Sequence, residues 1–142
     1  MKRIKDLRTR GIGTHRIQQE APVEDAVAEF TAKNVSALVV YDGEKLAGIF
    51  TKNDLIRCVC GHPDGIRGLK VGDHMKTNIF TTTVDANLDD VKEVMVEKGF
   101  RHVPVLDGDE VIGMVTLIDI LANQKSHLGS ERDELVRYIQ GS

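Results

Sequence analysis

Two short stretches of the sequence share a pattern of residues that could bind a ligand. The stretch Gly48-Ile-Phe-Thr-Lys-Asn-Asp54 is matched, 65 positions later, by Gly113-Met-Val-Thr-Leu-Ile-Asp119. A threonine followed three residues later by an acidic residue is an ordinary helix start, in which the hydroxyl and the carboxylate cap backbone N–H groups. The same residues suit a nucleotide, because a helix N-terminus favours phosphate and a carboxylate can accept from two ribose hydroxyls. One motif alone leaves both interpretations open.

The segment Phe100-Arg-His-Val-Pro-Val105 is a second candidate site. Arg101 and His102 stand at the entry to a predicted strand and could reach phosphate oxygens, the arginine through a bidentate fork. The alternative is a solvated arginine and a partly buried histidine. Pro104 removes a backbone N–H from the strand, which predicts an edge strand or a bulge with backbone groups open to a ligand.

Cys58-Val-Cys-Gly-His62 could suggest metal chemistry. A structural zinc site needs four ligands, and only His62, Asp64 and His74 are near enough in sequence to complete one. We interpret the two cysteines as the end of a helix, one half-buried and one exposed, and predict no metal site. Walker, His-Glu-x-x-His and nucleophile-elbow motifs are absent from the sequence, so we predict no catalytic residues and no enzyme.

The two motifs lie within an internal repeat. An ungapped alignment of Ala21–Ile56 with Ala86–Leu121 gives nine identical positions. Apolar spacing predicts a helix near the start of each copy, and β-rich runs around an Asp-Gly turn predict a hairpin. Each copy therefore reads as helix, strand, strand, helix, with a short strand before the first helix. Two such α+β units are expected to bury their sheet faces against each other as a pseudo-two-fold pair.

The predicted organisation has four parts. Residues 1–60 form the first repeat, 61–70 a turn-rich connector and 71–125 the second repeat. Residues 126–142 form a C-terminal tail, in which Ser130 caps a predicted helix over Glu131–Gln140.

Composition narrows the class of protein. The chain has 142 residues, a net charge of -3, 41% apolar residues and 29% charged residues, which is typical of a soluble globular domain. Mild acidity and only 4% aromatic residues disfavour nucleic-acid binding. No apolar run approaches the ~20 residues that span a bilayer, so we expect no membrane association. Cys58 and Cys60 are too close for a usual disulfide framework, which favours a cytoplasmic location.

From about Ile4 to Lys125 the chain resembles a tandem pair of CBS domains, a Bateman module, of the small stand-alone bacterial type. The resemblance rests on the duplicated Gly-apolar-apolar-Thr-x-x-Asp motif and on the segments Asn34–Asp42 and Arg101–Asp107. It implies an α+β fold of two β-α-β-β-α repeats packed sheet to sheet, acting as a non-catalytic regulatory sensor of energy or metabolites. It also implies a homodimer, a possible effector protein and no required cofactor. The implied ligands are AMP, ADP, ATP, S-adenosylmethionine or NAD-type molecules.

The resemblance further implies two composite ligand clefts. One combines Thr116 and Asp119 with the backbone of Ser36, Ala37 and Leu38. The other combines Thr51 and Asp54 with His102, Val103 and Pro104, with Arg101 near the phosphates.

The first repeat departs from the family pattern in one respect. Asn53 stands where similar proteins often carry arginine, which weakens the expected phosphate binding and favours the Asp119 cleft. Two alternatives stay open. One is a structural or protein-interaction CBS pair that no longer binds nucleotide. The other is a metal- or redox-responsive protein using Cys58, Cys60 and His62.

Overall fold

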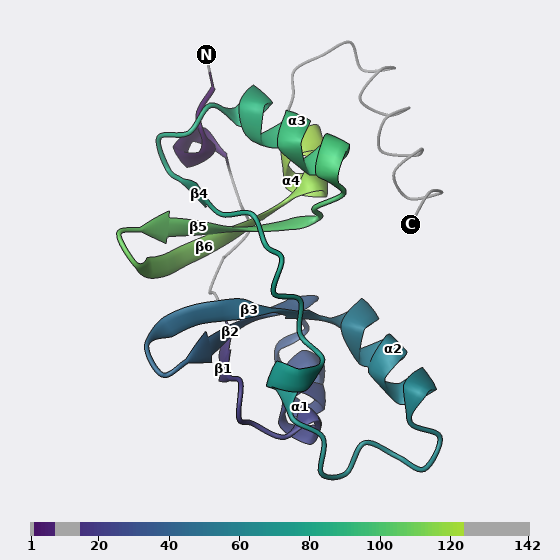
Figure 1. Cartoon of the computed structure of the whole chain (residues 1–142). Coiled ribbons are helices and arrows are strands. Elements are labelled where there is room, and N and C mark those ends of the chain that lie inside the picture. Colours follow the sequence, from purple (N-terminus) through teal and green to yellow (C-terminus); the bar gives the residue numbers. More distant parts are fainter. Residues whose placement is uncertain (1, 8–14, 124–142) are drawn as a thin grey trace. The chain divides into compact units, whose positions relative to one another are not determined.

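The computed structural model describes residues 2–7 and 15–123, which form two compact α+β units (Figure 1). The first-repeat unit comprises residues 15–79 and 108–111, and the second-repeat unit comprises residues 2–7, 80–107 and 112–123. The predicted sheet-to-sheet packing of the repeats stays a prediction.

The first-repeat unit has the predicted order of elements. A short strand β1 (Arg16–Gln18) precedes helix α1 (Val23–Lys33), the hairpin β2 (Ala37–Asp42) and β3 (Lys45–Thr51), and helix α2 (Lys52–Gly61). The sheet order is β1-β2-β3, with β1 parallel and β3 antiparallel to β2.

The second repeat has the same order of elements along the chain. Its elements are β4 (Thr82–Thr83), α3 (Leu88–Lys98), β5 (His102–Asp107), β6 (Glu110–Thr116) and α4 (Leu117–Asn123). The sheet order is β4-β5-β6, with β4 parallel to β5. Gly43 and Gly108 turn the two hairpins with φ values of 64° and 62°, a left-handed conformation that glycine adopts without steric cost. The predicted Asp-Gly hairpins are therefore confirmed.

The helices bury the faces that their apolar spacing predicts. Helix α1 buries Val23, Ala26 and Phe30, and α3 buries Leu88, Val91 and Met95. Each helix ends at a residue in the left-handed conformation, Asn34 in the first repeat and Gly99 in the second. Each unit has its own apolar core between sheet and helices.

The segment in front of each repeat pairs with the other repeat. In the second-repeat unit, the N–H groups of Ile4 and Lys5 donate to the carbonyls of Ala86 and Val84, at 3.0 and 2.9 Å. In the first-repeat unit, the N–H groups of Val71 and Gly72 donate to Ala21 and Gln19, at 2.9 and 2.8 Å. Short 3-10 helices (Ile4–Asp6 and Val71–Asp73) occupy these segments. The compact units are consequently interleaved along the chain.

Pro104 lies in β5, the middle strand of its sheet, so of the two expectations the edge strand is wrong, and the bulge stays a prediction. The first repeat shows the hydrogen bond that Pro104 cannot make. There the N–H of Val39, the residue that matches Pro104, donates to the carbonyl of His15 at 2.9 Å. Proline has no N–H for this bond. Correspondingly, β4 pairs only with Val105 and Leu106, beyond Pro104, whereas β1 pairs from Val39 onward.

Within the described ranges no helix is long and apolar enough to cross a membrane. The predicted helix over residues 131–140 lies outside the described residues.

Candidate functional site

The first Thr-x-x-Asp motif forms a complete capping box at the start of α2. The backbone N–H and the hydroxyl of Thr51 both donate to Asp54 Oδ2, each at 2.9 Å. The N–H of Asp54 donates back to Thr51 Oγ1 at 3.1 Å. The capping interpretation of this motif is therefore confirmed.

Two cations contact the other oxygen of the same carboxylate. Arg57 Nη1 lies 3.3 Å and Lys76 Nζ 3.6 Å from Asp54 Oδ1. The Asp54 side chain is only 3% exposed, whereas Arg57 and Lys76 are 69% and 48% exposed. Both oxygens of Asp54 are thus engaged, and the cations cover the carboxylate from the solvent side.

Backbone pairing along the edge of β3 brings Lys76 to the motif. Ile49 and Lys76 exchange N–H···O bonds of 3.0 and 2.8 Å. A Cβ on Gly48 would overlap the Lys76 carbonyl oxygen and lie 2.9 Å from Met75 Sδ, so glycine is required for this approach. Sequence reasoning missed Lys76; the available signal was a glycine inside a strand, which indicates close approach of another backbone.

The second motif has the same cap in a more open setting. Thr116 N–H donates to Asp119 Oδ2 at 3.0 Å, and Asp119 N–H donates to Thr116 Oγ1 at 3.1 Å. Both residues are half-buried. The helix position that matches Arg57 is Ala122, which carries no charge.

Each motif lies beside the middle strand of its own repeat. Lys52 N–H donates to the Ser36 carbonyl at 3.1 Å, Ala37 pairs with Thr51, and Leu117 N–H donates to the Arg101 carbonyl at 3.2 Å. The side chains of Leu38, Val103 and Pro104 are buried, so a ligand could contact only their backbone. Arg101 and His102 are half-buried, and Asn53 is exposed. The composite clefts implied by the resemblance stay predictions.

Comparison with known proteins assigns the family. The family model for the CBS domain matches twice, over residues 6–61 and 71–126. The chain belongs to the CBS-domain family. The predicted α+β fold of two CBS repeats is likewise confirmed by solved structures. A CBS-domain protein from Agrobacterium tumefaciens, 27% identical, superposes with a TM-score of 0.76 over 85% of this chain and 98% of that one.

Two further relatives are similar to most of this chain. The mitochondrial CBS domain-containing protein CBSX3 of Arabidopsis thaliana is 34% identical over 127 residues, covering 84% of this chain and 60% of that protein. This chain therefore spans about three fifths of that relative. The protein CBSX2, solved in complex with AMP, is 26% identical, with a TM-score of 0.69 over 84% of this chain and 93% of that one.

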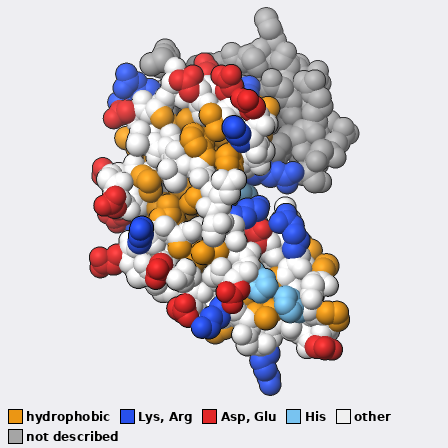
Figure 2. Space-filling view, in the orientation of Figure 1, with side chains coloured by type: hydrophobic (Ala, Val, Ile, Leu, Met, Phe, Trp, Pro, Cys, Tyr) orange, Lys and Arg blue, Asp and Glu red, His pale blue; other side chains and the backbone are white. Residues whose placement is uncertain are grey.

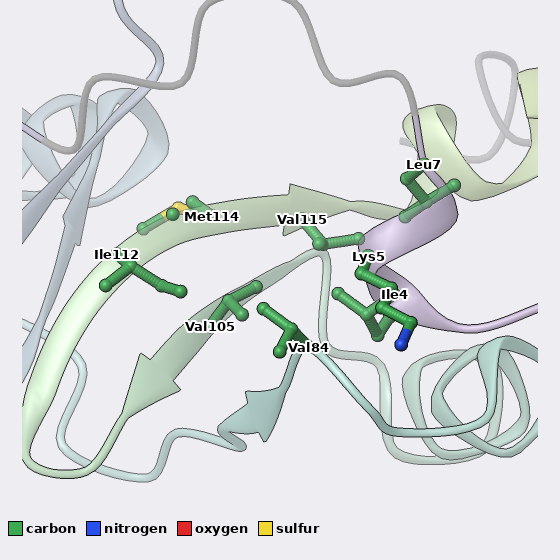
Figure 3. Close-up of a pocket in the computed structure, with 9 residues that line it drawn as sticks. Ile4, Lys5, Leu7, Val84, Val105, Ile112, Met114 and Val115 are labelled. Carbon is green, nitrogen blue, oxygen red and sulfur yellow. The ribbon is translucent and has the colours of Figure 1, made fainter.

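An apolar pocket opens within the second-repeat unit (Figure 3). Its volume is about 270 Å³, close to the lower end of the range of ligand pockets, ~300 Å³. Residues 112–115 of β6, which lead directly into the motif threonine of this CBS repeat, form one wall. The polar exception in the lining is Lys5, whose ammonium lies 3.3 Å from Asp85. The pocket is large enough to admit a nucleobase. It is lined by Ile4, Lys5, Leu7, Val84, Val105, Ile112, Gly113, Met114 and Val115.

The cysteine and histidine candidates of the first-repeat unit lie close in the chain, but their contacts are not those of a metal-ligand set. Cys58 is buried in the core, deeper than expected, and burial raises the pKa of its thiol; Cys60 is exposed. His62 Nδ1 lies 2.8 Å from the Cys58 carbonyl, and its ring meets His74 edge to face at 5.2 Å. Figure 2 shows histidines side by side on this unit. Among the described residues, no three His, Cys, Asp or Glu side chains are grouped to hold a metal ion.

Proposed function

We propose that this CBS pair is a regulatory module that binds an adenosine-containing ligand, with Asp119 and Thr116 at the principal site. The observation that carries the proposal is the contrast between the two capped carboxylates. Asp119 is half-buried and so within reach of a ligand, whereas Asp54 is 3% exposed beneath two cations. A carboxylate held in this way accepts hydrogen bonds only, as two ribose hydroxyls require.

Two further observations support an adenosine ligand. The lining of the pocket includes Met114 and Val115, the two residues of β6 that precede Thr116 in the chain, and we propose that the base lies there. The related protein CBSX2 has been solved with AMP. We propose AMP, ADP or ATP first, with NAD and S-adenosylmethionine as further candidates.

The mechanism we propose is a population shift without catalysis. A ligand that binds one arrangement of the module more tightly than another favours that arrangement, by no more than its difference in affinity. We expect the module to act in the cytoplasm as a homodimer that passes this change to an effector protein. A ligand at 100 times its dissociation constant would stabilise the folded chain by about 2.7 kcal/mol.

Thermal unfolding with AMP, ATP, NAD and S-adenosylmethionine tests the proposal. The melting temperature of the unsubstituted chain should rise with the concentration of at least one of them. Asp119→Ala should lower the melting temperature without ligand, because the carboxylate that accepts from the Thr116 N–H is lost, and should remove most of the ligand-dependent rise. Asp89→Ala, which removes an exposed first-turn aspartate of α3, is the matched control and should keep the rise.

A structural role is the second candidate, favoured by the contacts of Asp54 to Thr51, Arg57 and Lys76. On this alternative Asp54→Ala and Asp119→Ala lower stability equally with and without nucleotide. Absence of a thermal shift with all four compounds would refute the adenosine proposal.

A further inference from the structure

The carboxylate of Asp54 is covered by cations from two different segments. Arg57 comes from α2 itself, one helical turn after Asp54, and Lys76 comes from the segment that follows the 3-10 helix Val71–Asp73. Oδ2 already accepts from the N–H and the hydroxyl of Thr51, so the ion pairs fall on Oδ1. A ribose hydroxyl can therefore reach this carboxylate only if a cation moves from Oδ1.

The Lys76 side chain can move, but its backbone cannot follow. Its N–H and carbonyl both pair with Ile49, and the segment lies directly against Gly48. The half-exposed lysine side chain has the rotamer freedom to swing aside. After displacement, its ammonium remains tethered within a side-chain length of Asp54.

Resting on the function proposed above, we propose that Lys76, with Arg57, makes the first CBS repeat selective for adenosine ligands that carry a phosphate. Cations displaced from Asp54 need a replacement anion, and a phosphate provides one through charge-assisted hydrogen bonds. Uncharged adenosine offers no anion. S-adenosylmethionine places a sulfonium cation at the 5′ position, next to two existing positive charges.

This proposal changes the interpretation of Asn53, which stands where similar proteins often carry arginine. The positive charge absent from position 53 is supplied at the same carboxylate by Arg57 and Lys76. At the second CBS repeat the residue matching Arg57 is Ala122, so the helix supplies no such cation there.

The test is isothermal titration calorimetry with AMP, adenosine and S-adenosylmethionine on the full chain carrying Asp119→Ala, which isolates the first repeat. This protein should bind AMP at least about tenfold more tightly than adenosine or S-adenosylmethionine, as expected for a hydrogen bond to a charged group. Adding Lys76→Met should reduce that ratio by about tenfold. Lys70→Met is the matched control, because Lys70 lies in the same segment and pairs instead with Glu20 at 2.8 Å; it should leave the ratio unchanged.

Several results would overturn the inference. One is an unchanged ratio in the Lys76→Met protein, with folding verified by circular dichroism. If that protein does not fold, Arg57→Gln takes its place and must lower the same ratio. Another is an Asp119→Ala protein that binds none of the three compounds while the unsubstituted chain binds at least one. If the unsubstituted chain binds none of them, the proposed function itself has failed.

Discussion

Replacing Gly48 with alanine should separate the segment around Lys76 from the edge of β3. The added Cβ would overlap the Lys76 carbonyl oxygen and lie 2.9 Å from Met75 Sδ. The methionine sulfur can move, because its side chain is flexible. The carbonyl is backbone, held by its own bond from Ile49, and relief therefore requires the segment to shift.

The cost can be worked from the contacts that would be lost. Two backbone hydrogen bonds join Ile49 and Lys76, and each contributes about 1 kcal/mol net. Overpacking adds about 1–3 kcal/mol. The smaller conformational freedom of alanine in the unfolded chain offsets about 0.4–1 kcal/mol. We expect Gly48→Ala to lower the free energy of unfolding by roughly 2–5 kcal/mol, which combines these three contributions.

Urea unfolding followed by circular dichroism measures this difference. The matched control is Gly61→Ala, at the last residue of α2, where an added Cβ meets nothing within 4 Å; it should change the free energy of unfolding by less than about 1 kcal/mol, in the stabilising direction. Equal stability of the Gly48→Ala and unsubstituted proteins would refute the close approach of Lys76 to β3. It would also remove the structural basis for the Lys76–Asp54 contact.

Two further predictions concern a helix cap and the cysteines. Asn87→Ala should lower the free energy of unfolding by about 1 kcal/mol, measured in urea, because Asn87 Oδ1 accepts from the N–H groups of Asp89 and Asp90 in the first turn of α3. An unchanged urea midpoint would contradict this cap. In the folded protein a disulfide reagent at pH 8 should modify Cys60 rapidly and Cys58 only slowly, since Cys58 is buried and burial raises its thiol pKa. In the Cys60→Ser protein only Cys58 can react, so the rate of modification is that of Cys58 alone. A rapid reaction would contradict the burial of Cys58.

Local signals predicted the repeated elements well because each is decided by a few neighbouring residues. Asp-Gly sequences turn the hairpins because glycine adopts the positive φ at Gly43 and Gly108. The predicted ends of α1 and α3 are correct because Asn34 and Gly99 adopt the left-handed conformation that stops a helix. The Thr-x-x-Asp cap is equally local, and it forms in both repeats.

The exchange of segments between repeats could not be predicted in the same way. It depends on backbone bonds such as Lys5 to Val84 and Gly72 to Gln19, which leave no apolar periodicity in the sequence. The pairing segments are also offset by 67 positions, Ile4 against Val71, while the repeats are offset by 65. The gap-free alignment therefore gave no indication that Lys76 meets Asp54.

The two motifs show why a Thr-x-x-Asp match alone does not define a ligand site. The cap needs only the threonine and aspartate of one helix start, so both copies retain it whatever else surrounds them. Charge around the carboxylate is not part of the cap: the helix position that carries Arg57 in the first repeat carries Ala122 in the second, and Lys76 from another segment also contacts Asp54. Ligand preference should follow these surrounding charges, because they determine what must be displaced before a ribose can bind.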